Sequence, residues 1–216
     1  MSDRTPQELV SSVATMLRLP VSKVRNFDRQ LMEAGLRSKK GHGRGSAVMN
    51  HTDAAMLLAA IASSDEISQA AECVSKARKL PFANLSHKEE DDFVKKYLRS
   101  SILPEIGDPR DFSTFGRAID AVMKYLVVQQ RSDFFSMEIV TVSGEPLAAY
   151  IIISSRGQIV SSRNGVDRIE FYRRGTEKTF ISGGLRVSRT VQGPTISGIA
   201  EIISGRALPV RPEELA

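Results

Sequence analysis

The sequence predicts an α+β protein, in which a helical N-terminal part precedes an antiparallel β-sheet with flanking helices. Apolar residues recur at helical spacing up to about residue 131, with breaks at prolines and glycines. After Asp133 they alternate with polar residues, which indicates strands with one buried face. Asn164-Gly165 lies between two such runs, and this pair is typical of a two-residue hairpin turn.

Capping signals define the first two helices. Thr5-Pro6-Gln7-Glu8 predicts a helix start, because the threonine can cap the helix and the glutamate three residues later completes a capping box. Leu19-Pro20 ends this helix. Ser22 is expected to cap a second helix over about residues 22–34, which Gly35 stops.

The second helix has two distinct sides. Val24, Phe27 and Leu31 fall on one side at helical spacing and form an apolar stripe that should pack inward. The polar and basic residues are left facing outward: Ser22, Lys23, Arg25, Asn26 and Arg29.

The remaining elements follow in order along the chain. Thr52 is expected to cap a third helix, and a fourth should run from about 64 to 79 before a break at Pro81. Further helices are expected over 86–101 and about 113–131. Strand patterns follow at 134–142, 147–154, 159–163, 166–174, 179–182 and 185–191. We expect these strands to form a continuing meander, which a helix at 196–204 closes.

Positive charge is concentrated near the N-terminus. Residues 18–44 hold eight Lys or Arg and two Asp or Glu, whereas the whole chain has a net charge of +5. The stretch GLRSKKGHGRG at 35–45 combines this charge with four glycines. Focused positive charge attracts polyanions such as nucleic acids, and glycine permits close approach to a sugar-phosphate chain.

Two short helices with a basic outer face on the second have the geometry of helix-turn-helix DNA binding, in which the second helix lies in the major groove. The segments LPVSKVRNFDRQLMEAGL and RSKKGHGRGSAV resemble winged-helix transcription regulators, with the spacing of the GntR type. Val24-Arg25, Leu31, Gly35-Leu36 and Gly43-Arg44-Gly45-Ser46-Ala47-Val48 match that pattern in order. The resemblance implies a reading helix over about 22–34 and a basic wing over about 37–48.

Other features resemble MerR-type regulators, whose helix pair also begins at the N-terminus. In those regulators the wing is followed by a segment with Thr or Ser, then Asp, then Leu and Ile. The segment here is similar, with His51-Thr52-Asp53 followed by Leu58 and Ile61. The resemblance covers residues 7–65. The residues expected to bind DNA are Ser22, Lys23, Arg25, Asn26 and Arg29 on the reading helix, and Lys39, Lys40, His42 and Arg44 on the wing.

The chain carries no motif that indicates catalysis or metal binding. His42, His51 and His87 have no ligand spacing with a carboxylate, and Cys73 is the only cysteine. GHGRG lacks the following G-K-[ST] of a phosphate loop. We therefore expect no catalytic residue, no metal and no cofactor, and a protein that is not an enzyme.

The sequence also predicts where the protein works. No apolar run approaches the roughly 18 residues of a membrane helix. The N-terminus MSDRTPQELV lacks the apolar core of a signal peptide. We expect a cytoplasmic protein without a membrane partner.

Together these features predict a sequence-specific transcription regulator that binds double-stranded DNA. The expected regions are a winged helix-turn-helix domain at 1–80, a helical linker at 81–109 and an α+β dimerisation or effector domain at 110–216. A homo-oligomer is expected, with a dimer favoured because DNA readers often engage two half-sites.

An alternative function is a DNA-recognition subunit of a phage or mobile element, similar to a small terminase, that oligomerises through its C-terminal region. The oligomer mass separates the two, since a dimer favours regulation and a ring favours packaging. The residues leave open whether there is an effector and what the second basic run at 156–189 does.

Overall fold

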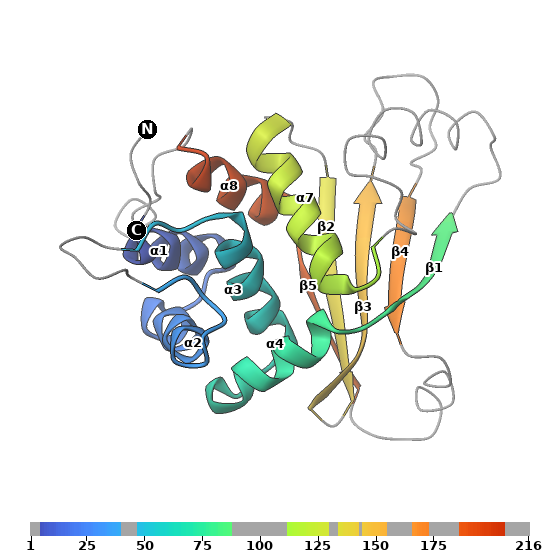
Figure 1. Cartoon of the computed structure of the whole chain (residues 1–216), viewed down its shortest axis with the longest axis horizontal. Helices are drawn as coiled ribbons and strands as arrows, with labels where there is room; N and C mark the ends of the chain where they lie inside the picture. Colours follow the sequence, from blue (N-terminus) through green and yellow to red (C-terminus); the bar gives the residue numbers. More distant parts are fainter. Residues whose placement is uncertain are drawn as a thin grey trace.

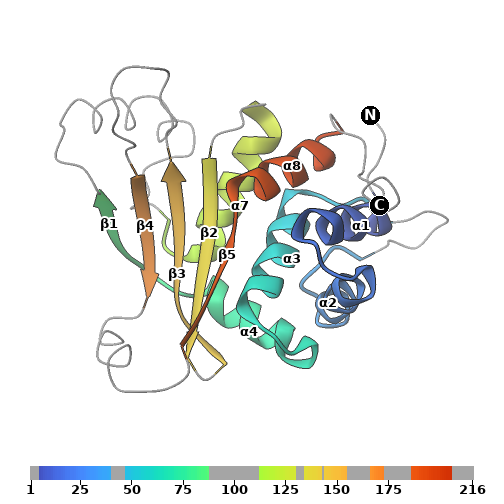
Figure 2. The same cartoon turned by 180° about the vertical axis from the view of Figure 1, so that it is seen from behind.

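The computed structural model describes residues 5–39, 47–87, 112–129, 134–142, 144–154, 166–172 and 186–205. In these ranges the helices pack on one face of a five-stranded antiparallel sheet (Figures 1 and 2). Helices lead the chain and a helix follows the last described strand. The predicted α+β class is therefore confirmed.

The helical layer starts with the predicted capping box. The amide N–H of Glu8 donates to Thr5 Oγ1 over 3.2 Å, and the amide N–H of Thr5 donates to Glu8 Oε2 over 2.8 Å. The helices in the described ranges are α1 (Pro6–Leu17), α2 (Val21–Glu33), α3 (His51–Ser63), the 3-10 helix η1 (Ile67–Gln69), α4 (Ala70–Arg78), α7 (Phe115–Gln129) and α8 (Gly193–Ile203).

Two of the expected helix caps are wrong. Helix α2 follows Pro20 and has no side-chain cap, so Ser22 lies within its first turn rather than before it. Helix α3 is capped by Asn50 instead of Thr52, because Asn50 Oδ1 accepts the amide N–H groups of both Thr52 and Asp53. The end of α2 is as predicted, since Gly35 follows it with a positive φ of 72° that glycine adopts easily.

The described strands do not continue as a simple meander. They are β1 (Phe82–His87), β2 (Phe134–Val142), β3 (Glu145–Ser154), β4 (Val166–Tyr172) and β5 (Arg186–Val191), in the spatial order β1-β4-β3-β2-β5. Strand β5 pairs with β2 at the edge opposite to β1, which corrects the expected meander. The hairpin at Asn164-Gly165 and the strands expected at 159–163 and 179–182 lie outside the described residues.

The expected helical linker is also corrected at its start. Residues Phe82–His87 form β1, which pairs antiparallel with β4. The Phe82 ring packs edge-on against the Phe171 ring, with centroids 6.1 Å apart, and this apolar contact favours pairing with the sheet over a separate helix. The helix expected over 86–101 is wrong at Ser86 and His87, which belong to β1, and its residues 88–101 lie outside the described residues.

One continuous hydrophobic core joins the helices to the sheet. Ile169 and Phe171 alternate along β4 and are buried beneath the helices, which agrees with the prediction that the strands have one buried face. The same cluster contains residues from both ends of the described chain, including Leu9, Val13, Phe27, Leu57, Ile119, Ile139, Phe171 and Ile199. The described parts of regions 1–80 and 110–216 therefore do not have separate cores.

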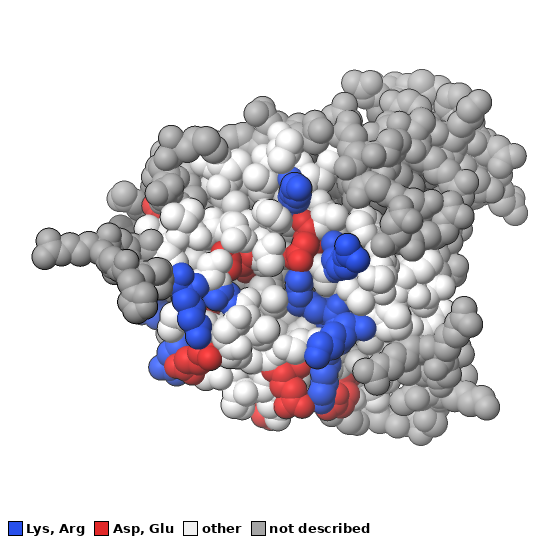
Figure 3. Space-filling model, in the orientation of Figure 1, with Lys and Arg blue, Asp and Glu red and all other residues white. Residues whose placement is uncertain are grey.

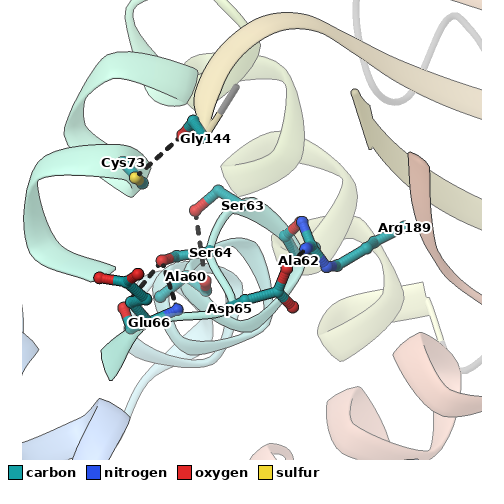
Figure 4. Close-up of polar contacts among 9 residues, drawn as sticks. All are labelled: Ala60, Ala62, Ser63, Ser64, Asp65, Glu66, Cys73, Gly144 and Arg189. Atoms are coloured by element: carbon teal, nitrogen blue, oxygen red, sulfur yellow. Dashed lines mark hydrogen bonds and ion pairs between the residues drawn. The ribbon is translucent and has the colours of Figure 1, made fainter. Parts of the chain in front are cut away.

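Polar contacts tie the end of α3 and α4 to the sheet (Figure 4). Arg189 on β5 pairs with Asp65, and its Nη1 also donates to the carbonyl oxygen of Ala62. The Cys73 thiol donates to the carbonyl oxygen of Gly144 in the β2–β3 turn, over 3.6 Å. Burial raises the pKa of this thiol, so Cys73 is a packed neutral side chain.

The closest helix contacts give a test of the packing. A Cβ on Gly116 of α7 would lie 3.0 Å from Arg78 Cβ and from the Arg78 carbonyl oxygen, whereas one on Gly198 of α8 would meet the end of the flexible Met16 side chain. Gly116→Ala should unfold at lower urea concentration than wild type. Overpacking should destabilise the fold by about 1–3 kcal/mol, which exceeds the stabilisation of about 1 kcal/mol that alanine gives over glycine in a helix. Gly198→Ala should be neutral or stabilising, and the reverse order of the two variants would contradict this packing.

Candidate nucleic-acid interface

Helix α2 presents the predicted outer face to solvent. Val24, Phe27 and Leu31 are fully buried, as the apolar stripe predicts. Of the expected DNA-binding residues on this helix, Ser22, Arg25 and Arg29 are exposed, and Lys23 and Asn26 are half-buried. The space-filling view shows Lys and Arg side chains gathered over α2 (Figure 3). The helix thus displays a basic surface while its apolar side is fixed in the core.

Glu33 interrupts the basic surface at the end of α2. Its Oε1 lies 3.9 Å from Arg29 Nε, one turn earlier, and the two side chains are 57% and 59% exposed. An ion pair this long and exposed contributes little to stability. It does place a carboxylate next to a cation that was expected to contact DNA, so Glu33 opposes the approach of a phosphate.

A buried ion pair links α2 to the segment that follows it. Arg37 Nε lies 2.7 Å from Asp28 Oδ1, and the two side chains are only 6% and 9% exposed. Burial raises the pKa of Asp28, although the Arg37 guanidinium beside it acts in the opposite direction. Arg37 Nη1 also donates to the carbonyl oxygen of Ser38 over 3.0 Å. The positive charge of Arg37 is therefore paired with Asp28 inside the protein and is not available to a nucleic acid.

One carboxylate closes the base of the glycine-rich loop. Asp53 Oδ1 accepts the amide N–H of Ser38 over 2.8 Å, and Asp53 Oδ2 accepts the amide N–H of Asn50 over 3.0 Å. Asn50 Nδ2 also donates to Ser38 Oγ over 3.4 Å. The two ends of the loop, twelve residues apart in the chain, are thus held together at the start of α3.

The structure places only part of the expected wing. Lys39 is described and exposed, whereas Lys40, His42 and Arg44 lie outside the described residues. In the described flanks, 37–39 and 47–48, the chain forms no β-strand. At its base the loop is held by the Asp53 carboxylate instead of a β-ladder.

Several residues at the junction of α2, the base of the glycine-rich loop and α3 were not predicted from the sequence. Asn50 and Asp53 carry a detectable signal, because an asparagine followed three residues later by an acid is a capping pattern like that of Thr5 and Glu8. Asp28 and Arg37 carry none, since charged residues are rarely buried and their pairing depends on the tertiary fold. In the second basic run, Arg189 is committed to Asp65, and most of the other cations lie outside the described residues.

The described ranges were also compared with the requirements of a metal site and of a membrane-spanning helix. Within them no three His, Cys, Asp or Glu side chains are grouped so as to hold a metal ion. None of the helices in these segments has the length and apolarity that crossing a bilayer demands. Comparison of the chain with protein-family models, with curated proteins and with solved structures gave no match.

The buried ion pair gives a test of the junction. Asp28→Leu or Arg37→Met alone should lower the free energy of unfolding by about 3 kcal/mol, because each leaves the other charge buried without a partner. The double variant should recover most of this loss, since two apolar side chains need no partner. Urea unfolding of the four proteins measures the coupling. Additive losses would show that the two groups do not pair.

Proposed function

We propose that the protein is a sequence-specific transcription regulator that places α2 in the major groove of double-stranded DNA. The observation that carries this proposal is the exposed basic face of α2 on a helix whose opposite side is fully buried. A major groove about 12 Å wide admits one α-helix. A helix used in this way must be held rigidly from behind, and Val24, Phe27 and Leu31 provide that support.

The residue types on this face suit the edges of bases. Arg25 and Arg29 lie one turn apart and can each donate two hydrogen bonds to a guanine, as arginine commonly does in the major groove. Asn26 between them is the residue type that pairs with adenine. Ser22 in the first turn suits a phosphate, which helix N-termini also favour.

The loop after α2 supports a second contact with the same duplex. Its base is fixed beside α2 by the Asp28–Arg37 pair and by the Asp53 carboxylate. Lys39 lies next to this base and is exposed to solvent. Lys40, His42 and Arg44 follow it in the sequence. We assign these four residues to the phosphate backbone or the minor groove, where basic side chains bind without a base-specific pattern.

The proposal extends to assembly and location. A dimer would present two copies of α2 to two half-sites about one helical turn apart, roughly 34 Å. The oligomer mass measured by light scattering, with and without DNA, checks this part independently of affinity. We place the protein in the cytoplasm.

Arg25 and Arg29 should carry sequence preference. Arg25→Ala or Arg29→Ala should each cost roughly 1–3 kcal/mol of binding to a site selected from random duplexes. Binding to an unrelated duplex should change less, since that binding depends on phosphates. Fluorescence anisotropy with both duplexes gives the ratio. A variant that keeps the full preference of wild type would remove that residue from base reading.

Glu33 should weaken DNA binding, and its neutralisation should strengthen it. Glu33→Gln removes a carboxylate from the outer face of α2 and frees Arg29, so affinity should rise by roughly 0.2–1 kcal/mol on any duplex. Glu201→Gln on α8 is the matched control, because it removes the same charge from an exposed position on a helix outside the helix pair. Equal gains in both variants would mean that only net charge matters, and that α2 is not at the interface.

A further inference from the structure

A second group of cations lies outside the helix pair. The space-filling view shows Lys and Arg side chains over α4 and α7, on the same face of the molecule as those over α2 (Figure 3). We call this group the α4–α7 stripe. Its described members are Lys76, Arg78, Lys79, Arg117 and Lys124.

Two of these cations are already committed to carboxylates. The Arg78 guanidinium binds Asp120 through two hydrogen bonds, of 3.0 Å to Oδ1 and 2.6 Å to Oδ2. Lys76 Nζ lies 2.8 Å from Glu72 Oε1 and 2.7 Å from Glu145 Oε1. These two carboxylates raise the pKa of Lys76.

The other three cations have no carboxylate partner among the described residues. Lys79, Arg117 and Lys124 are all exposed. Asp120 follows Arg117 by three residues and precedes Lys124 by four, so it could pair with either along α7. Arg78 holds Asp120 instead, from α4. The stripe thus keeps three positive charges that no carboxylate of the described residues neutralises.

These three cations are close in space because the end of α4 meets the start of α7. Leu80 directly follows Lys79, and its carbonyl oxygen accepts the amide N–H of Phe115 over 2.9 Å. Arg117 and Lys124 lie on one side of α7, two turns or about 10 Å apart. Helix α4 also packs against α2, and the stripe lies on the same face of the molecule as the cations over α2, with uncharged surface between the two groups (Figure 3).

We infer that the α4–α7 stripe is a second DNA-binding surface, which binds phosphates of the duplex beside the bases that α2 reads. The inference rests on the proposed function. Each strand presents a phosphate about every 3.4 Å along the axis, so Arg117 and Lys124, about 10 Å apart along α7, can each meet a different one. Lys79 can meet a further one from the end of α4. These contacts are independent of sequence, and they orient the duplex on α2.

The salt dependence of DNA affinity tests the stripe. In the variant Lys79→Gln/Arg117→Gln/Lys124→Gln, the slope of log affinity against log salt should become shallower by about 2.7, or about 0.9 for each lost phosphate contact. The preference for a selected site over an unrelated duplex should stay at the wild-type value. Arg25→Ala should do the opposite and lower that preference.

A pair of single variants separates contact from net charge. Lys124→Gln and Lys76→Gln each remove one positive charge from the stripe, but Lys76 is held by two carboxylates. Lys124→Gln should make the slope shallower by about 0.9, and Lys76→Gln should leave it unchanged. Equal effects of the two would overturn the inference.

The remaining outcomes distinguish the two proposals. A wild-type protein that binds no duplex would refute the proposed function itself. A wild-type protein that binds DNA, together with a triple variant of unchanged slope, would refute the stripe alone. If that triple variant instead lost binding to polyglutamate, the stripe would be a surface for an acidic protein, which also overturns the inference.

Discussion

The geometry around α2 depends on two buried carboxylates, Asp28 on α2 itself and Asp53 in the first turn of α3. Asp28 forms a buried ion pair with Arg37, and Asp53 accepts amide N–H groups from both ends of the glycine-rich loop. Because Asp53 also completes the capping box of α3, these contacts join α2, the base of the loop and α3 at one point. They add to the Asn50–Ser38 hydrogen bond and to the core packing of Leu36 and Met49 on the two flanks. Buried charge thus helps to fix the base of the loop beside α2.

Local signals predicted much of the fold. The capping box at Thr5, the stop at Gly35 and the apolar stripe of α2 were all readable, because each depends on residues within one or two turns. Strand β2 was predicted to the residue, and the expected single buried face is seen in β4 at Ile169 and Phe171. Alternation within a strand states which residues are buried, and it needs no knowledge of the partner strand.

Nonlocal contacts account for what the sequence did not predict. The pairing of β5 with β2, and of β1 with β4, joins segments far apart in the chain, and strand patterns carry no information about such partners. The same holds for the site. The exposed face of α2 followed from periodicity, whereas the burial of Arg37 and the opposing charge of Glu33 depend on their surroundings. Counting Arg37 with the other basic residues of 18–44 therefore overstated the charge that faces solvent.

The close approach of α8 to α1 at Gly198 and Met16 has a consequence for biosynthesis. Leu9 and Val13 share their core with Ile199, so the packing beneath the first helix is incomplete until the last described helix has left the ribosome. Helix α1 emerges early but cannot complete its burial before α8 is available. Until then its apolar side lacks the partners that α8 supplies, and exposed apolar surface of this kind favours aggregation of nascent chains.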